Sequence, residues 1–200
     1  MKIQSHNSWT YLKPKKFWMK LIRFTAKCQS VDIYDQYYLY DVKAFDLRIR
    51  FDKNGNLVIA HGLVEFDYTY DELIKDLEFL NNVRGFTVRI LHEIRNKKQN
   101  ENKNLVKFIE FCADVQRRFK NIDFYGGQSV YDWHVDYNFK KTFTEDNHYA
   151  SVCLPKVIDD WFPWLYAVLH NKKALKKGTD KDLLVIDFVN IGNSYVSKQV

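Results

Sequence analysis

The sequence predicts an α/β fold, because short apolar runs alternate along the chain with amphipathic segments, which is the pattern of strands joined by helices. The 200 residues are 46% hydrophobic and 16% aromatic, which suffices for one well-buried core and is little for two ordinary domains. Only three prolines and seven glycines are present, so there is little material for a flexible linker. We therefore expect a single domain over residues 1–200.

Seven runs have the length and composition of β-strands, one fewer than a full barrel of about eight strands requires. In chain order they are residues 2–6, 44–51, 57–60, 86–91, 122–125, 150–154 and 183–189. Between the second and third runs lies Asn54-Gly55, a strong tight-turn signal, so these two strands should be joined by a short reversal. Residues 126–149 are polar, aromatic and irregular, and their pattern predicts no particular element.

Helical periodicity occurs in three segments. Residues 70–81 and 104–119 each place their apolar side chains on one side, so both helices should pack on the sheet. A third helix should begin near Pro14 and have one basic and one apolar face. Its basic face would carry Lys16, Lys20, Arg23 and Lys27, and its apolar face Phe17, Leu21, Phe24 and Cys28. We expect this apolar face to pack on the barrel and to leave Trp18 and the basic face exposed.

Charge and cysteine content restrict the partners and the compartment. Thirty-one basic against 25 acidic side chains give a net charge of +6, which favours anionic partners such as phospholipid or nucleotide; we expect no specific nucleic-acid partner. Cys28, Cys112 and Cys153 are odd in number and far apart, and are expected to be reduced thiols in apolar surroundings. The chain starts without an apolar signal segment and has no run of roughly 18 apolar residues. We expect a cytoplasmic protein whose membrane contact, if any, is peripheral.

Histidines and charged residues stand at the ends of several predicted strands. The segments are Ser5-His6-Asn7-Ser8-Trp9, Phe45-Asp46-Leu47-Arg48, Val58-Ile59-Ala60-His61-Gly62 and Val185-Ile186-Asp187-Phe188-Val189-Asn190. Over residues 1–95 their order and spacing resemble the catalytic X region of the phosphatidylinositol-specific phospholipase C family, closest to its bacterial metal-independent branch. The fourth segment looks like that family's closing strand, whereas residues 120–180 match none of its motifs. The resemblance implies a distorted (β/α) barrel of the phosphodiesterase kind over residues 1–200, smaller than a full barrel if only seven strands are present.

Cleaving a phosphodiester next to a hydroxyl needs a base for the hydroxyl proton, an acid for the departing oxygen and a cation for the phosphoryl charge. Histidine suits both proton transfers near neutral pH. The resemblance implies that His6 is the base toward the inositol 2-hydroxyl and His61 the acid toward the diacylglycerol oxygen, giving a cyclic phosphodiester. It further implies that Arg48 grips the phosphate and that Asp187 orients His6.

Each of these residues also has a structural interpretation. A lone histidine at a strand end is more often structural than catalytic, and only the ordered set of His6, Asp46, Arg48 and His61 favours catalysis. Asp187 lies in an apolar run and should be a buried carboxylate that needs a partner. The other four histidines, expected to be at the surface or structural, are His92, His134, His148 and His170.

Two departures from the bacterial branch concern metal. Asn7 and Glu93 stand where the calcium-dependent eukaryotic branch has asparagine and a calcium-binding carboxylate. Together with Asp46 they could supply oxygen ligands to calcium. Arg48, however, falls where that branch places another carboxylate, and its guanidinium would repel the cation. We favour a site without metal or cofactor, in which Asn7, Asp46 and Glu93 line the substrate pocket and Glu93 pairs with Arg48, with calcium as the alternative.

The amino-terminal aromatic residues suggest a membrane contact. Trp9, Phe17 and Trp18, with Lys16 and Lys20 beside them, resemble the short helix by which these enzymes touch a bilayer, where aromatics and cations give weak, salt-sensitive adsorption. The predicted partners are therefore an anionic phospholipid surface and a small-molecule phosphodiester.

Other functions fit the same residues. The same chemistry could act on a soluble inositol phosphodiester or a nucleotide signal, and Asn7 makes a catalytically silent, lipid-binding barrel conceivable. Glycerophosphodiesterases fit less well, because the chain has neither their His-Arg-Gly opening nor an obvious carboxylate metal cluster.

Overall fold

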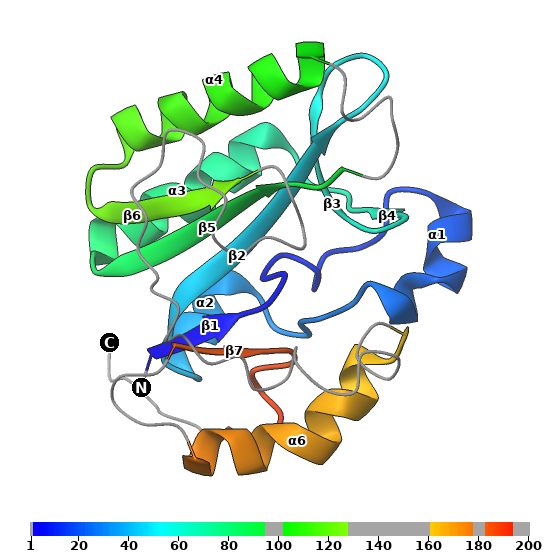
Figure 1. The fold of residues 1–200 in the computed structure, drawn as a ribbon, viewed down its shortest axis with the longest axis vertical. Coiled ribbons are helices and arrows are strands. Elements are labelled where there is room, and N and C mark those ends of the chain that lie inside the picture. The colour runs from blue at the N-terminus through cyan, green and yellow to red at the C-terminus, as the bar shows by residue number, and fades with distance from the viewer. Residues whose placement is uncertain (1, 95–101, 128–160, 178–182, 194–200) are drawn as a thin grey trace.

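A computed structural model describes residues 2–94, 102–127, 161–177 and 183–193. Its centre is a sheet of five parallel strands in the order β7-β1-β2-β5-β6 (Figure 1). The strands are β1 (Lys2–Ser5), β2 (Val42–Phe51), β5 (Phe86–His92), β6 (Ile122–Gly127) and β7 (Leu183–Ile186). Nearly every residue in them is buried, as expected for parallel strands covered on both faces.

The long strand β2 joins this sheet to a small antiparallel extension. Ala44 pairs with Gln4 of β1 and Thr87 of β5, whereas Ile49 pairs with Ile59 and His92. Strand β3 (Leu57–His61) therefore lies on the same side of β2 as β1, beyond its carboxyl end, and β4 (Val64–Glu65) pairs with β3. The predicted reversal between β2 and β3 is present, with positive φ at Gly55.

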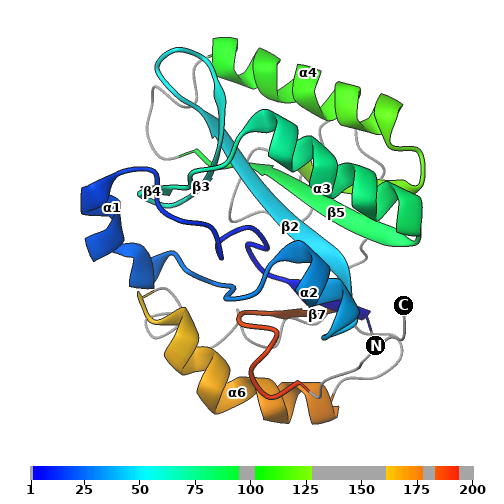
Figure 2. The same ribbon diagram turned by 180° about the vertical axis from the view of Figure 1, so that it is seen from behind.

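Helices cover the outside of the sheet (Figure 2). Helix α3 (Tyr70–Val83) begins with a capping box between Thr69 and Glu72 and buries Leu73, Leu77 and Leu80. Helix α4 (Asn102–Arg118) has contacts with β2 and β5, and α6 (Pro163–Lys177) packs against β7. A short helix, α2 (Ile33–Tyr38), is capped by Asp32 and contacts β2. None of the helices in these ranges is long and apolar enough to cross a membrane.

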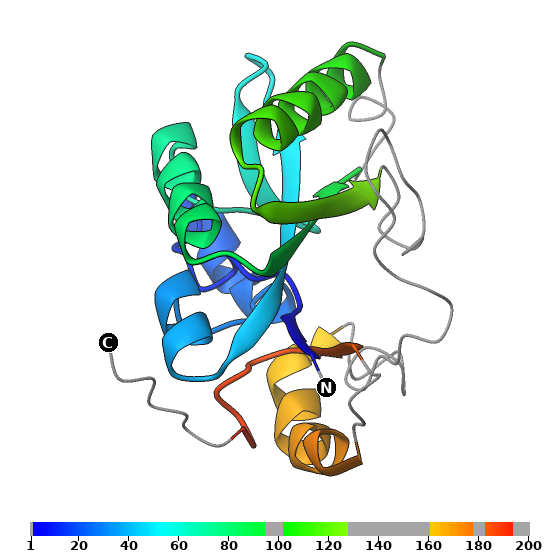
Figure 3. The same cartoon turned by 90° about the vertical axis from the view of Figure 1, so that its left-hand side faces the viewer.

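The predicted fold is a barrel, but the sheet formed by the described residues is open and not closed into one. In the described ranges β6 and β7 lie at opposite edges of the sheet and do not pair (Figure 3). Five parallel strands are too few to bend back on themselves, since such barrels normally have about eight. The predicted strand 150–154 and the unassigned segment 126–149 fall largely or wholly outside the described residues, whereas the other six predicted strands are all present.

The predicted amphipathic helix after Pro14 is broken into two short pieces. Helix α1 spans Phe17–Leu21 and the 3₁₀ helix η1 spans Arg23–Thr25. Pro14 instead forms an antiparallel bridge with Phe66, and Arg23 donates hydrogen bonds to the carbonyl oxygens of Tyr11 and Leu12, which folds the segment back on its own start. The expectation that the apolar face packs inward is wrong: Phe17, Leu21 and Phe24 are 77%, 69% and 54% exposed.

Candidate active site

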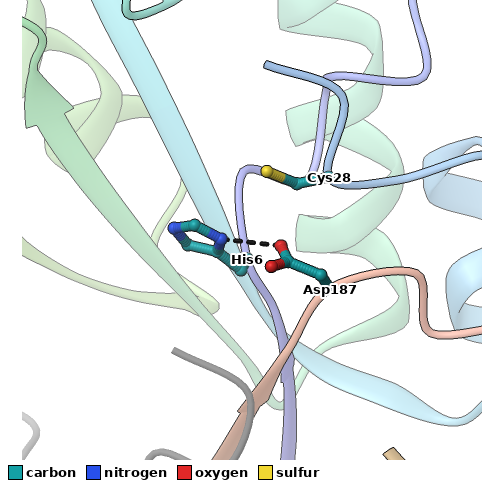
Figure 4. A group of neighbouring side chains, drawn as sticks. All are labelled: His6, Cys28 and Asp187. Atoms are coloured by element: carbon teal, nitrogen blue, oxygen red, sulfur yellow. Dashed lines mark hydrogen bonds and ion pairs between the residues drawn. The ribbon is translucent and has the colours of Figure 1, made fainter. Parts of the chain in front are cut away.

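The site is built where parallel strands end. Ser5 of β1 pairs with Ile186 of β7, so the residues that follow, His6 and Asp187, emerge side by side. The Nδ1 atom of His6 lies 2.7 Å from an Asp187 carboxylate oxygen (Figure 4). Both side chains are buried, and a buried carboxylate accepts from the ring N–H, which fixes the proton on Nδ1. The predicted contact between Asp187 and His6 is thus present in the structure.

Arg48 faces the other ring nitrogen. Its Nη2 lies 2.7 Å from His6 Nε2, and its Nε donates to Asp46 at 3.1 Å. Asp46 and Arg48 share one face of β2 because they are two residues apart in a strand. Since a guanidinium only donates, His6 Nε2 must accept in this arrangement. His6 is therefore held with a proton on Nδ1 and a lone pair on Nε2, the form that a general base needs.

His61, at the end of β3, lies on the opposite side of this group. Its ring centroid is 6.1 Å from that of His6, and its Nδ1 donates to the Ala26 carbonyl oxygen at 3.0 Å. Burial lowers the His61 pKa to about 4, and the positive charge of Arg48 acts in the same direction. In this state His61 is neutral at pH 7, and its second nitrogen, Nε2, carries the lone pair.

Asn7 and Asp46 form a hydrogen-bonded group beneath the ring of His6. The backbone of Asn7 has a positive φ of 45°, which asparagine tolerates better than most residues, and its N–H donates to Asp46 at 3.1 Å. The Asn7 side-chain nitrogen lies 3.3 Å from His6 Nε2. Burial would raise the Asp46 pKa, but the charges of Arg48 and Arg89 outweigh it and hold that pKa at about 2. Asp46 is thus an anion at neutral pH.

Glu93 connects His61's strand end to Arg48. One carboxylate oxygen accepts from the Gly62 backbone N–H at 2.8 Å, and the other lies 3.6 Å from Arg48 Nη1. The guanidinium of Arg48 therefore sits between the carboxylates of Asp46 and Glu93. Burial opposes its charge, yet these two anions raise the Arg48 pKa. A calcium ion held by Asn7, Asp46 and Glu93 would have to share this space with a fixed positive charge, so the residues present do not fit that metal well.

Arg89 and Gln29 contribute to the site and Cys28 lies beside it, and none of the three was predicted as a site residue. Arg89, which pairs in register with Asp46, was signalled by a charge in the middle of an apolar run. Gln29 donates to the carbonyl oxygens of His6 and Ile186 and so ties β1 to β7. Cys28 is buried as expected, but among polar groups, with its sulfur 3.8 Å from His61 Nδ1. Gln29 lies in no periodic segment. The period that places Cys28 on the apolar face of the predicted amphipathic helix indicates burial, but not a position beside His61.

The residues predicted to touch a membrane separate into two groups. Trp9 is only 1% exposed and its indole N–H donates to Asp76 at 2.8 Å, so its assignment to the rim is wrong: β1 ends in a turn that points this ring into the core. Phe17, Trp18, Lys16 and Lys20 are all exposed. His92 and Cys112 are buried in the interior, while His134, His148 and Cys153 lie outside the described residues.

An exposed aromatic surface joins α1 and η1 to the start of α6. Its members are Phe17, Trp18, Leu21, Phe24, Trp161, Phe162 and Trp164, which are 45% to 77% exposed. Phe24 stacks on Phe162 with ring centroids 5.9 Å apart, which joins the two parts. The start of α6 lies next to the end of α1 in both ribbon views (Figures 1 and 2). Contiguous exposed apolar side chains of this size usually mark an interaction surface.

Comparison with known proteins places the fold. No family model matches the chain, and neither does any curated protein. Among solved structures, a single-residue variant of the phosphatidylinositol-specific phospholipase C from Staphylococcus aureus is similar, with a TM-score of 0.63 at 13% identity over 98% of this chain and 88% of that one. The chain has the fold of this phospholipase C. A second structure of the S. aureus enzyme matches with a TM-score of 0.48 at 14% identity, and there the match covers 74% of this chain and 55% of that protein. Identities this low make the likeness to phospholipase C one of fold.

Proposed function

We propose that this protein is a phosphodiesterase that cleaves phosphatidylinositol-type phosphodiesters by attack of a vicinal hydroxyl, with His6 and His61 as the base and the acid. The observation that carries the proposal is the pair of imidazoles, 6.1 Å apart, with the Arg48 guanidinium bound to one of them and both tautomers fixed by acceptors on Nδ1. A phosphate that displaces Arg48 from His6 Nε2 would leave that nitrogen facing the attacking hydroxyl.

The proton transfers follow from this arrangement. His6 Nε2 takes the proton of the attacking hydroxyl, and Asp187 stabilises the imidazolium that forms. Arg48 binds the non-bridging phosphate oxygens and neutralises the charge that grows on them. His61 then protonates the departing oxygen and the product is a cyclic phosphodiester. Asn7 and Asp46 hold His6 and Arg48 in place.

His61 must take up a proton before it can act. Its pKa of about 4 in the empty site reflects burial and the nearby Arg48. A bound phosphodiester adds a negative charge that offsets Arg48, so the His61 pKa rises when substrate binds. His61 is thus neutral while the site is empty and becomes an acid in the complex.

The aromatic surface supports a lipid substrate over a soluble one. Exposed tryptophan and phenylalanine side chains beside Lys16 and Lys20 suit the interface of an anionic bilayer, where rings enter the acyl boundary and ammonium groups face phosphates. Phe24 of this surface stands two residues before Ala26, whose carbonyl oxygen accepts from His61 Nδ1, so the chain runs directly from the surface to the histidine pair.

Activity on a substrate panel tests the proposal. The purified protein would be given phosphatidylinositol in vesicles, a soluble glycerol phosphoinositide and a nucleotide phosphodiester, each with and without chelator, and products followed by phosphorus NMR. We expect a cyclic inositol phosphate from the lipid, at a rate that chelator does not reduce because Arg48 supplies the positive charge. Cleavage of the soluble esters alone would show that the substrate is a soluble phosphodiester. Loss of activity in chelator that calcium restores would indicate a cation site at Asn7, Asp46 and Glu93. No cleavage of any substrate would indicate a catalytically silent binding protein.

A further inference from the structure

We infer that His6, Cys28 and Asp187 form a binding site for a thiophilic divalent cation such as Zn²⁺, and that a bound cation prevents His6 from acting as the general base. One ligand atom from each of the three side chains lies within 4.8 Å of the other two, and all three residues are buried (Figure 4). In the described part of the chain this is the one such group of three histidine, cysteine or acidic side chains. The chemistry of phosphodiester cleavage gives Cys28 no role, so its place between the two histidines is otherwise unexplained.

The donor set suits zinc. Imidazole nitrogen, thiolate sulfur and carboxylate oxygen are the three ligand types that zinc takes, whereas calcium takes oxygen alone. Bonds of about 2.0–2.3 Å to a common ion place ligand atoms roughly 3–4 Å apart, so side-chain movements of about 1 Å would close the site. The cluster therefore differs in residues and in metal preference from the calcium alternative at Asn7, Asp46 and Glu93.

Asn7 provides an independent indication. Its side chain is 2% exposed and its nitrogen lies 3.7 Å from the Cys28 sulfur, so the amide is directed at the cluster. Its Oδ1 atom has no hydrogen-bond partner in the described residues. A buried amide oxygen without a partner is costly, and rotation of the amide would direct this oxygen at the cluster as a fourth ligand or as an acceptor for a metal-bound water.

Binding has a defined proton balance. The metal takes the Nδ1 position of His6, so the neutral ring carries its one proton on Nε2 instead; the thiol of Cys28 loses its proton to solvent, and Asp187 exchanges the ring N–H for the metal. One proton is released in all. Since Nε2 is then a donor, it can no longer accept a proton from a substrate hydroxyl, and the Arg48 guanidinium, which donates to Nε2 in the metal-free site, must turn away from it. The inhibition, but not the binding, rests on the proposed function.

Cobalt spectroscopy on the whole protein tests the binding without any assay of activity. Co²⁺ bound to a thiolate gives a charge-transfer band in the near ultraviolet, and Zn²⁺ should displace it and raise the melting temperature. We expect the band in the wild type and in Cys112→Ala, the matched control for a buried thiol on α4. We expect no band in Cys28→Ala or in Cys28→Ser, and Zn²⁺ affinity lower by on the order of 100-fold in both. Two replacements are used in case one of them fails to fold.

Activity measured in parallel separates the two proposals. Cys28→Ala should cleave the substrate like the wild type and lose most of its sensitivity to Zn²⁺, while calcium should affect both proteins alike. A cobalt band that persists in the Cys28 variants, or is absent from the wild type, would overturn the metal site. A normal band in a protein without any phosphodiesterase activity would leave the metal site standing and refute the proposed function alone.

Discussion

At the scale of single residues, the candidate site depends on which ring nitrogen carries the proton. His6 and His61 both donate from Nδ1, to Asp187 and to the Ala26 carbonyl oxygen respectively. Each therefore presents Nε2 with its lone pair, yet their surroundings differ. The acceptor at Nδ1 is a carboxylate for His6 and a neutral carbonyl for His61. Burial also lowers the His61 pKa to about 4. These surroundings support the two tasks of the proposed mechanism, in which His6 accepts a proton and His61 donates one once substrate has bound.

These unequal tasks predict different responses to the leaving group. Without His6 no base remains for the attacking hydroxyl, so His6→Ala should be slow with every substrate. In His61→Ala only protonation of the departing oxygen is lost, and a nitrophenol leaves readily as its anion. With a lipid substrate each variant should lose about 10²- to 10⁴-fold in rate. With an aryl phosphodiester, the cleavage rate of His61→Ala should recover substantially and that of His6→Ala hardly at all, as measured by steady-state kinetics.

His170 on α6 supplies the control for removing an imidazole. Its ring packs against Tyr166 and has no part in the proposed proton transfers, so His170→Ala should behave as the wild type with both substrates. Equal rescue of the His6 and His61 variants would show that acid and base are interchanged or wrongly assigned. Unchanged rates in both would exclude them as the catalytic pair.

At the scale of elements, the break at Ile22 decides what the amino-terminal helix can do. A continuous helix could have placed Phe17, Leu21 and Phe24 together against the sheet. Instead Ile22 leaves helical geometry, and only Met19 of α1 is buried. The apolar side chains that remain outside extend the aromatic surface of α6 rather than the core.

Removal of apolar side chains from α1 should weaken membrane adsorption without affecting stability. Phe17 and Leu21 are 77% and 69% exposed, so Phe17→Ser and Leu21→Ser remove little apolar surface that folding buries. Each variant does lose the ring or isobutyl group that would insert into lipid. Full burial of such a side chain contributes roughly 1.5–3 kcal/mol, so each change should reduce partitioning onto anionic vesicles by about tenfold. Vesicle sedimentation measures the partitioning, and thermal melting checks the stability.

Val106 on α4 offers a matched exposed apolar residue at 52% exposure, outside the aromatic surface. Val106→Ser should bind vesicles like the wild type. If it weakened binding as much as the α1 variants, adsorption would depend on general surface hydrophobicity, and α1 would not be the contact.

At the scale of the whole molecule, buried ionisable groups make stability depend on pH. His92 at the end of β5 is fully buried, with its ring stacked 5.1 Å from Phe108 of α4. Burial lowers its pKa to about 4, against 6.5 when unperturbed, and the attraction of Glu93 does not reverse this. The unfolded chain therefore takes up this proton at a higher pH than the folded protein does. The contribution of His92 to stability is complete above pH 6.5 and is lost as the pH falls toward about 4.

His92→Phe tests this by keeping an aromatic ring against Phe108 while removing the titration. Denaturant unfolding should show that, between pH 7 and about pH 4, the free energy of unfolding falls by up to about 3 kcal/mol more in the wild type than in this variant. His170→Ala should keep the wild-type dependence. If His92→Phe declined in parallel with the wild type, acid sensitivity would come from other groups, His61 being the first to examine.

Much of the fold and the candidate site could be predicted from the sequence because both depend on local pattern. Strand period, the Asn54-Gly55 turn and the periodic faces of α3 and α4 are properties of short segments. His6 and Asp187 follow the parallel strands β1 and β7, whose carboxyl ends lie at one edge of the sheet. This shared edge predicts the proximity of His6 and Asp187, and the 2.7 Å between their side chains agrees with it. Arg48 lies within β2, and His61 ends the antiparallel strand β3. The approach of Arg48 and His61 to His6 is expected from the family resemblance instead.

What only the tertiary structure decided is which surfaces meet. Sequence periodicity shows that α1 has an apolar face but not that Arg23 turns the chain back and leaves that face outside. Trp9 lies in the core because of its contact with the distant residue Asp76. Cys28 lies beside the histidines because of its contact with His61. That β6 and β7 do not pair within the described ranges is likewise a matter of long-range contacts. Local pattern fixes which side chains stand at a strand end, and only non-local packing fixes what lies opposite them.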